Sequence, residues 1–317
     1  MQDSPPALSI IIPTHNRPQK LRKTLEALFN SKWSYAPPQV EVVIVDDGSE
    51  PPIEVQLADI EAPPPYTLRF LRQSQQGPAA ARNTGFKKSQ GEIVLFLDDD
   101  IILLPSALER HYNFHTKASD QKAMLFGDCP SEQEFQILIS ENGLLDSRVE
   151  TVPHVASGHI SFRRSLFEGE ELPYAEFLRT PVAEEYELSY RLHQRGIPTY
   201  RDCGIVGVHQ VPPSTLSYIC QREYRHGHAL GELSCKLPEI LRLTGIPPLV
   251  QKHHPYRPQL SLRWIAKAIL AYTGTHKYLT KLFGRVPYRQ NSALHKLLVG
   301  AHIMRGFMEG LRKWRRR

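Results

Sequence analysis

The chain has 317 residues, of which 41 % are apolar and 23 % are charged, a composition that fits a globular protein and excludes a disordered or fibrous chain. Its apolar runs are too short to span a bilayer. Its four cysteines form no Cys-x-x-Cys pair, which predicts free thiols rather than a disulfide framework. The first residues lack a basic and then apolar signal pattern, so we expect a cytoplasmic protein.

The net charge of +6 is unevenly distributed. Residues 251–317 hold 15 Lys and Arg residues and one acidic residue, so this segment carries +14 and the rest of the chain −8. The apolar residues of the basic segment recur at helical spacing, which predicts amphipathic helices. We expect this segment to meet an anionic partner, with peripheral docking on the inner face of the cell membrane as one hypothesis and a solvated basic face as the alternative. It has no motif that reads nucleic acid, so no nucleic-acid partner is expected.

Three short apolar runs predict strands that are buried on both faces: Leu8–Pro13, Val40–Val45 and Ile93–Leu97. A helix at Pro18–Asn30 lies between the first two runs. A weak strand at 68–71 and a helix near 79–89 lie between the second and third. This order, β-α-β-β-α-β, predicts a doubly wound α/β sheet.

The rest of the chain changes character twice. Residues 129–213 alternate short strands with one clear helix, Glu184–Gln194, and the pattern after residue 214 is helical. We therefore expect an α/β domain over residues 1–213, with halves at about 1–128 and 129–213. A basic, mostly helical region should follow over residues 214–317. The Gly306–Gly310 spacing lies on a charged helix and has little weight as a signal.

Polar clusters follow the predicted strands, at the edge where ligands bind in open α/β sheets. Three adjacent carboxylates, Asp98, Asp99 and Asp100, repel one another unless a cation lies among them. Oxygen ligands favour a hard divalent ion, Mg²⁺ or Mn²⁺. Asp46 and Asp47 end the second run and could accept hydrogen bonds from a nucleobase or a ribose.

Arg82 follows three alanines in the predicted helix near 79–89. The small residues would let this helix approach the sheet closely. A guanidinium above the same edge could clamp a pyrophosphate.

Four segments together resemble the family 2 glycosyltransferases of the GT-A fold. They are Ser9-Ile-Ile-Ile-Pro-Thr-His-Asn-Arg17, Val42-Val-Ile-Val-Asp-Asp-Gly-Ser49, Ala81-Arg-Asn-Thr-Gly85 and Gly91-Glu-Ile-Val-Leu-Phe-Leu-Asp-Asp-Asp100. The resemblance covers about residues 7–212. It implies a doubly wound, mixed GT-A sheet with a C-terminal helical extension.

The resemblance also implies roles for residues after the predicted strands. The nucleotide site would comprise Pro13, Thr14, His15, Asn16, Asp46, Asp47 and Arg82. Asp98 and Asp100 would be the ends of the family's DxD metal motif, and Asp99 could share the Mn²⁺ or Mg²⁺ ion. His209 could approach the metal, although a structural hydrogen bond is an equal alternative. Gly158 and His159 would contact the donor sugar or the acceptor.

An acidic pair opens the helix that supplies the catalytic base in the family. Here the pair is Glu184 and Glu185. At about 100° per residue, Glu185 shares the face of Leu188 and Leu192, whereas Glu184 points away, so Glu185 is the expected base. The family usually has Asp here, and Glu is longer by one methylene.

The expected function is therefore inverting transfer of a sugar from a nucleotide diphosphate to an acceptor hydroxyl, in polysaccharide or glycoconjugate synthesis. A UDP-sugar is favoured as donor over a GDP- or dTDP-sugar, and the acceptor would be a glycan or a lipid-linked molecule. One alternative is a non-catalytic module that binds a nucleotide-sugar or a glycan. A sugar nucleotidyltransferase would need a glycine-rich loop after the first strand, and residues 14–18 contain no glycine.

Overall fold

The computed structural model describes residues 5–117, 122–142, 148–152, 158–167, 169, 171–177, 184–211, 215–239, 262–286 and 292–314. The chain forms two compact units. The first, here called the sheet unit, comprises Met1–Arg179 and Leu188–Val211. The second, the helical unit, comprises Thr180–Glu187 and Pro212–Arg317.

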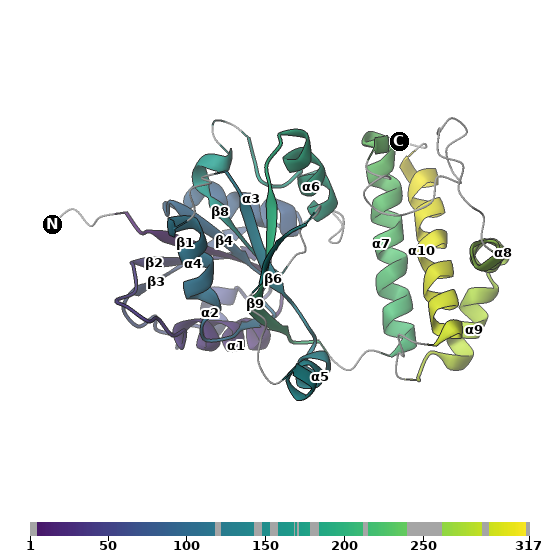
Figure 1. Cartoon of the computed structure of the whole chain (residues 1–317), viewed down its shortest axis with the longest axis horizontal. Helices are drawn as coiled ribbons and strands as arrows, with labels where there is room; N and C mark the ends of the chain where they lie inside the picture. The colour runs from purple at the N-terminus through teal and green to yellow at the C-terminus, as the bar shows by residue number, and fades with distance from the viewer. Residues whose placement is uncertain are drawn as a thin grey trace. The chain divides into compact units, whose positions relative to one another are not determined.

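The elements up to residue 209 are strands interspersed with helices (Figure 1). In chain order they are β1 (Leu8–Thr14), α1 (Pro18–Phe29), β2 (Val40–Asp47), α2 (Ile53–Gln56), β3 (Tyr66–Gln73), α3 (Pro78–Lys88), β4 (Ile93–Leu97), β5 (Ile101–Leu103), α4 (Ala107–Lys117), β6 (Met124–Asp128), α5 (Glu132–Asn142), β7 (Val149–Thr151), β8 (His159–Arg163), the 3₁₀ helix η1 (Arg164–Phe167), α6 (Glu184–Gln194) and β9 (Thr199–His209).

The strands form one mixed sheet in the order β3-β2-β1-β4-β8-β6-β9-β5, with β7 paired to β9. Strands β1 to β4 run parallel, whereas β8 is antiparallel to both β4 and β6. Every residue of β1, β2 and β4 is buried, as continuous apolar runs predict for the centre of a covered sheet. The expected mixed α/β sheet is confirmed.

Successive side chains of the central strands enter two cores on opposite faces of the sheet. Ile10 and Ile12 pack with the apolar residues of α1, α2 and α4. Ile11 packs with those of α3, η1 and α6 on the other face. The period of two along a strand places neighbouring residues on opposite faces, and helices on both faces make the sheet doubly wound.

Helix α3 lies very close to the sheet because of Gly85. A Cβ atom at this position would stand 2.3 Å from Ile11 Cγ2 and 3.1 Å from Val45 Cγ2. The small residues before Gly85 are buried as well. The close approach brings the start of α3 next to the ends of β1 and β2.

The helical unit contains α7 (Leu216–Lys236), α8 (Leu262–Thr273), α9 (Thr275–Phe283) and α10 (Ala293–Trp314). Helices α7 and α10 touch backbone to backbone at four glycines: Gly227, Gly231, Gly306 and Gly310. A Cβ at Gly306 would stand 2.0 Å from the carbonyl oxygen of Tyr224. The Gly306–Gly310 spacing therefore serves the packing of α7 against α10 within the helical unit.

None of the described helices combines the length and the apolar character needed to cross a bilayer.

Candidate active site

The carboxyl ends of the four parallel strands meet at one edge of the sheet. Thr14, the last residue of β1, pairs with Asp46 in β2, and Asp47 pairs with Gln73 at the end of β3. Asp98 follows β4 directly. This edge of an open α/β sheet is where ligands bind, so the structure gathers the predicted polar clusters in one place.

The exposed end of the carboxylate triplet is Asp98. Arg82 Nη2 donates to Asp98 Oδ1 at 2.6 Å, and the Arg82 guanidinium lies 5.0 Å from the ring centroid of Tyr174. The Arg82 side chain is nearly buried, whereas that of Asp98 is 29 % exposed. A buried, oriented guanidinium thus meets the one carboxylate of the triplet that solvent reaches most easily.

The middle carboxylate, Asp99, faces the interior. Thr14 Oγ1 donates to Asp99 Oδ2 at 2.7 Å, Arg17 Nη1 donates to Oδ1 at 3.2 Å, and Thr24 Oγ1 donates to the Asp99 carbonyl at 3.0 Å. Burial raises the pKa of Asp99 to about 6, against the opposing effect of Arg17. Asp99 therefore ties the end of β4 to β1 and α1.

The third carboxylate, Asp100, lies among cations. Lys20 Nζ donates to Asp100 Oδ2 at 3.0 Å, and Arg17 Nη1 donates to the same atom at 3.3 Å. His209 Nε2 at the end of β9 lies 3.3 Å from Asp100 Oδ1. Burial alone would raise the pKa of Asp100, but His209 and Lys20 lower it to about 2. Asp100 is consequently ionised at neutral pH.

The triplet has a donor set that suits a hard divalent cation. Asp98 and Asp100 supply carboxylate oxygens and His209 an imidazole nitrogen at the same edge. In the described ranges, no three His, Cys, Asp or Glu side chains converge as a complete metal cluster. A magnesium-type ion typically takes only one or two carboxylates and completes its shell with water and substrate phosphates. The donors at this edge fit that kind of binding.

Asp46 and Asp47 are both buried and accept hydrogen bonds from the loops that follow β2 and β3. Asp46 accepts from the backbone N–H groups of Ser49 (2.8 Å) and Ile53 (3.0 Å). Asp47 accepts from Gln76 N (2.9 Å), Gly77 N (2.8 Å) and Gln73 Nε2 (2.8 Å). These contacts shape the loops at the edge of the sheet.

The loop after β1 is joined to the loop after β2. Asn16 has a positive φ of 54°, its backbone N–H donates to Ser49 Oγ at 2.8 Å, and its side-chain oxygen accepts from Glu50 N at 2.9 Å. His15 Nδ1 lies 2.9 Å from the carbonyl oxygen of Asp47. Pro13 is buried at the end of β1. The edge is therefore held rigidly before any ligand arrives.

Gly158 lies beside the triplet through its backbone. Its carbonyl accepts from Asp98 N at 2.8 Å, and its φ of 125° lies in the region that favours glycine. A Cβ there would stand 2.3 Å from Cys129 Sγ. Gly158 thus fixes the backbone of Asp98.

His159 belongs to a buried chain of hydrogen bonds instead of the surface. His159 Nε2 lies 3.1 Å from the Asp128 carbonyl oxygen, and His159 Nδ1 lies 3.0 Å from His111 Nε2. Ser161 Oγ connects His111 Nδ1 (2.8 Å) with His115 Nε2 (2.9 Å). Both ring nitrogens of His159 are engaged inside the protein, so the ring offers no nitrogen to a sugar in this structure.

Burial keeps this histidine chain neutral. It lowers the pKa of His159, lowers that of His111 well below the ordinary value and lowers that of His115 to about 4. Because the Asp128 carbonyl only accepts, His159 donates from Nε2 and accepts at Nδ1. His111 then donates from Nε2, Ser161 donates to His111 Nδ1, and His115 donates to Ser161. Every donor points toward Asp128.

Glu184 and Glu185 open α6, as expected. Both side chains are buried, although they point in directions about 100° apart. An acidic pair in the first turn of a helix is stabilised by the N–H groups and the dipole at that end.

Sequence reasoning missed Arg17, Lys20 and Tyr174. Arg17 and Lys20 lie three residues apart at the start of α1, at the helical spacing that places two side chains on one face. This spacing was a usable signal for counter-charges to the triplet. Tyr174 lies in an irregular segment whose sequence carries no pattern.

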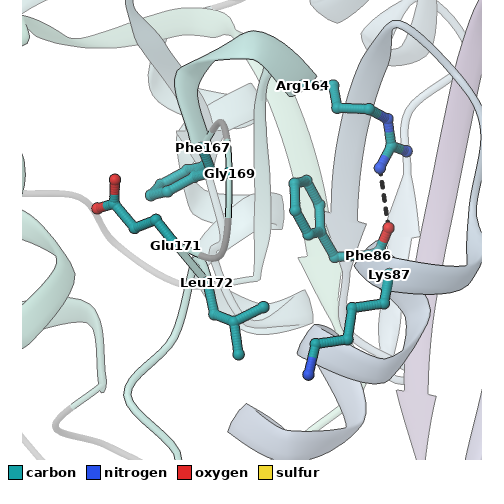
Figure 2. A pocket seen from close by; sticks show the side chains of 7 residues that line it. All are labelled: Phe86, Lys87, Arg164, Phe167, Gly169, Glu171 and Leu172. Carbon is teal, nitrogen blue, oxygen red and sulfur yellow. Dashed lines mark hydrogen bonds between the residues drawn. The ribbon is translucent and has the colours of Figure 1, made fainter.

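A separate pocket of about 640 Å³ lies at the other end of α3 (Figure 2). Its Arg164 donates to the carbonyls of Gly91 and Phe86 and to Ser89 Oγ, and Glu171 is held by Arg195. Arg164 and Glu171 therefore form hydrogen bonds within the protein. The pocket is lined by Phe86, Lys87, Arg164, Phe167, Gly169, Glu171 and Leu172.

Known proteins are similar to this chain in sequence and in fold. It is 33 % identical over 130 residues to a GalNAc(5)-diNAcBac-PP-undecaprenol beta-1,3-glucosyltransferase of Campylobacter jejuni, a match that covers 41 % of this chain and 40 % of the relative. It is 32 % identical over 107 residues to the poly(ribitol-phosphate) beta-N-acetylglucosaminyltransferase TarP of Staphylococcus aureus, covering 34 % of this chain and 32 % of that protein. The chain thus spans less than half the length of these curated relatives.

A mannosyltransferase of Pyrobaculum calidifontis, solved with GDP-Man and Mn²⁺, matches the structure with a TM-score of 0.62 at 17 % identity, over 98 % of this chain and 88 % of that one. This likeness confirms the GT-A fold. The family model described as glycosyl transferase family 2 matches residues 9–169, about half of the chain. With four sequence segments, the mixed sheet and its polar edge in agreement, the chain belongs to glycosyl transferase family 2.

Proposed function

We propose that the protein is an inverting glycosyltransferase that moves a sugar from a nucleotide diphosphate to an acceptor hydroxyl. The observation that carries the proposal is the pattern of charge at the edge of the sheet. Three carboxylates, Asp98 to Asp100, alternate there with Arg17, Lys20 and Arg82. A donor diphosphate bound with a divalent cation presents the complementary mixture of negative and positive charge.

Asp98 and Asp100 are the proposed ligands of a Mn²⁺ or Mg²⁺ ion, with His209 beside them. Such an ion, when bound, neutralises charge on the departing diphosphate. We assign Asp99 a positioning role because its oxygens are held by Thr14 and Arg17 in the interior.

Arg82 is the proposed clamp for the diphosphate. Its guanidinium is held over Tyr174, so little conformational freedom is lost when it binds an anion. Asp46 and Asp47, with the loop formed by Pro13, Thr14, His15 and Asn16, would shape the nucleoside pocket. UDP is the first nucleotide to test, and GDP and dTDP follow.

Glu185 is the proposed general base, with Glu184 as its neighbour in the first turn of α6. It would take the proton of the acceptor hydroxyl while that oxygen attacks the anomeric carbon from the face opposite the nucleotide. The bond between the anomeric carbon and the diphosphate oxygen breaks in the same step, which inverts the configuration.

The acceptor is proposed to be a glycan or a lipid-linked molecule, with the protein itself in the cytoplasm or peripheral on the inner face of the cell membrane. The Campylobacter jejuni relative is named for an undecaprenol-linked substrate and the Staphylococcus aureus relative for a poly(ribitol-phosphate), and both names support an acceptor of this class.

A panel of UDP, GDP, dTDP and CDP, with and without Mn²⁺, tests the donor site by thermal shift. We expect one nucleotide to raise the melting temperature only in the presence of metal. The double variant Asp98→Asn with Asp100→Asn should lose this metal-dependent shift. Full turnover by that variant would overturn the proposed metal site.

Release of nucleoside diphosphate then separates catalysis from binding. Glu185→Gln should keep the thermal shift and lose roughly 100-fold or more in turnover, the usual contribution of a general base. Glu187→Gln is the matched control, because Glu187 is buried in the same helix turn and has no proposed role. Nucleotide-sugar binding without any release by the wild type would favour a non-catalytic binding module.

A further inference from the structure

Helix α9 buries two polar residues beside Leu279, which packs into the bundle, and leaves large apolar residues exposed. Its buried residues are His276 (0 % exposed) and Thr280 (8 %), whereas Tyr278 and Leu282 are 74 % and 68 % exposed. A helix that faces water on one side normally buries its apolar stripe. The exposed side of α9 therefore suits an environment other than water.

The apolar surface continues before and after α9. Ile269 and Tyr272, three residues apart in α8, are 56 % and 76 % exposed, Phe283 at the end of α9 is 37 % exposed, and Val286 after it is 43 % exposed. We call this the docking face, and it consists of Ile269, Tyr272, Tyr278, Leu282, Phe283 and Val286. Single exposed apolar residues are common on proteins, but six within 18 residues of sequence are a concentration.

The charges around the docking face are positive. Lys277, Lys281 and Arg285 are exposed and alternate with its apolar residues. The sole acidic residue of segment 251–317, Glu309, accepts hydrogen bonds from Tyr224 and Arg305. The exposed charges on the face itself are thus all positive, and Glu309 interacts with only one of them, Lys277, among the described residues.

The buried polar side chains of α9 form hydrogen bonds inside the bundle. His276 Nδ1 lies 2.9 Å from the carbonyl oxygen of Leu270, and Thr280 Oγ1 lies 3.0 Å from His302 Nε2. These bonds hold α9 with its polar side inward. The orientation of the apolar side chains is consequently fixed by the fold.

We propose that α8 and α9 form a surface that docks on an anionic lipid bilayer. The apolar residues would enter the boundary between headgroups and acyl chains, with the two tyrosines at headgroup level. The basic residues would contact lipid phosphates. The match between basic charge, exposed aromatic side chains and an apolar stripe favours a membrane over an acidic protein, which would not require the apolar stripe. The proposal goes beyond sugar transfer and does not depend on the donor site.

Sedimentation of the full chain with vesicles tests the proposal. The wild type should bind vesicles of phosphatidylcholine with phosphatidylglycerol more tightly than vesicles of phosphatidylcholine alone. Lys277→Gln with Lys281→Gln should lower the affinity for anionic vesicles roughly 30-fold, at the usual contribution of a lysine near such a surface. Tyr278→Ser with Leu282→Ser should lower it at least about tenfold.

Matched controls come from the sheet unit. Val55 is 68 % exposed and Lys23 is also exposed, so Val55→Ser with Lys23→Gln removes the same kinds of side chain elsewhere and should leave binding unchanged. The exposed positions of all these variants predict unchanged melting temperatures. The nucleotide-dependent thermal shift should also persist in every variant, which separates this proposal from that of the donor site.

Two results would overturn the proposal. One is equal vesicle binding by the wild type and both docking-face variants. The other is a wild-type dimer in analytical ultracentrifugation without lipid that Tyr278→Ser with Leu282→Ser converts to a monomer, which would assign the face to a second copy of the chain.

Discussion

Both units of the molecule bury histidines, but they do so to different ends. In the sheet unit, His115, His111 and His159 form a chain that closes on the carbonyl of Asp128. In the helical unit, His276 uses Nδ1 to bond to Leu270, and its Nε2 is buried with no hydrogen-bond partner among the described residues.

The interiors of the two units are packed in different ways. The sheet unit fills two cores with apolar residues, and both ring nitrogens of His111 and of His159 are hydrogen-bonded. In the helical unit, His276 and Thr280 on α9 are buried, whereas Tyr278 and Leu282 on the same helix are exposed. Apolar side chains of α9 that could have filled the interior of the helical unit lie on its surface instead.

Acidification should produce the largest effect and should separate the two units. Burial lowers the pKa of five of the described histidines in the folded state, His111, His115, His159, His276 and His302, and to about 4 for His115 and His302. Below pH 6.5 the unfolded chain then binds more protons than the folded chain. The free energy of unfolding therefore has its maximum contribution from these histidines above pH 6.5 and falls as the pH drops toward about 4. The loss is about 1.4 kcal/mol per pH unit for each histidine.

Urea denaturation across this pH window, with a probe in each unit, measures the slopes. The described part of the sheet unit has three such histidines, but the raised pKa of Asp99, about 6, opposes one of them in this window. In the Asp99→Asn background the sheet unit should therefore show the steeper slope, compared with His276 and His302 in the helical unit. His111→Gln should reduce the slope, whereas the exposed His193→Gln should not. Equal slopes in the two units would contradict the comparison.

A methyl group at the α7–α10 contact should have the next largest effect. In Gly306→Ala the new Cβ meets the backbone carbonyl of Tyr224, which cannot rotate away, so we expect a loss of about 2–3 kcal/mol in the stability of the helical unit. Gly85→Ala in the sheet unit meets the side chain of Ile11 instead and should cost less. Chemical denaturation of both variants measures the difference.

Gly300→Ala is the control for that experiment. It lies in the same helix, and its Cβ would meet only the end of the flexible Lys267 side chain. We expect a gain of up to about 1 kcal/mol, because alanine favours a helix over glycine. A loss at Gly300 as large as that at Gly306 would mean that helix propensity and local strain, not the backbone contact, set the result.

Helix caps should give the smallest effect, similar in the two units. Thr215 Oγ1 accepts from Tyr218 N at the start of α7, and Ser131 forms a reciprocal cap with Glu134 at α5. Thr215→Ala and Ser131→Ala should each cost about 1 kcal/mol in urea denaturation. Thr215→Asp should restore the stability, and a failure to do so would assign the loss to packing of the threonine methyl group.

Much of the sheet could be predicted from sequence because its central strands are buried on both faces and read as continuous apolar runs. The edge strand β3 was predicted as residues 68–71 but covers Tyr66–Gln73, because most of its residues are only partly buried and its apolar signal is weaker. Helical spacing predicted α8 correctly, but it did not predict which side of this helix is exposed. Periodicity locates an apolar stripe, and only tertiary packing decides that Ile269 and Tyr272 face outward.

The residues of the site also differ in how well the sequence predicts them. The polar ends of β1, β2 and β4 were readable because parallel strands share one carboxyl edge. The spacing of Arg17 and Lys20 places both on one face of α1, but only tertiary packing turns that face toward Asp100. The burial of His159 depends on the position of β8 between β4 and β6 and on the histidines of α4.

The one-way chain from His115 to Asp128 has a consequence for communication through the core. A neutral imidazole has one proton for its two nitrogens, so reversing one bond forces every other member to exchange its protonated nitrogen. Because the Asp128 carbonyl can only accept, such a reversal would leave two acceptors facing each other at His159 and break the last bond of the line. The three imidazoles are therefore locked in one set of tautomers, and the line cannot relay a proton in the opposite direction.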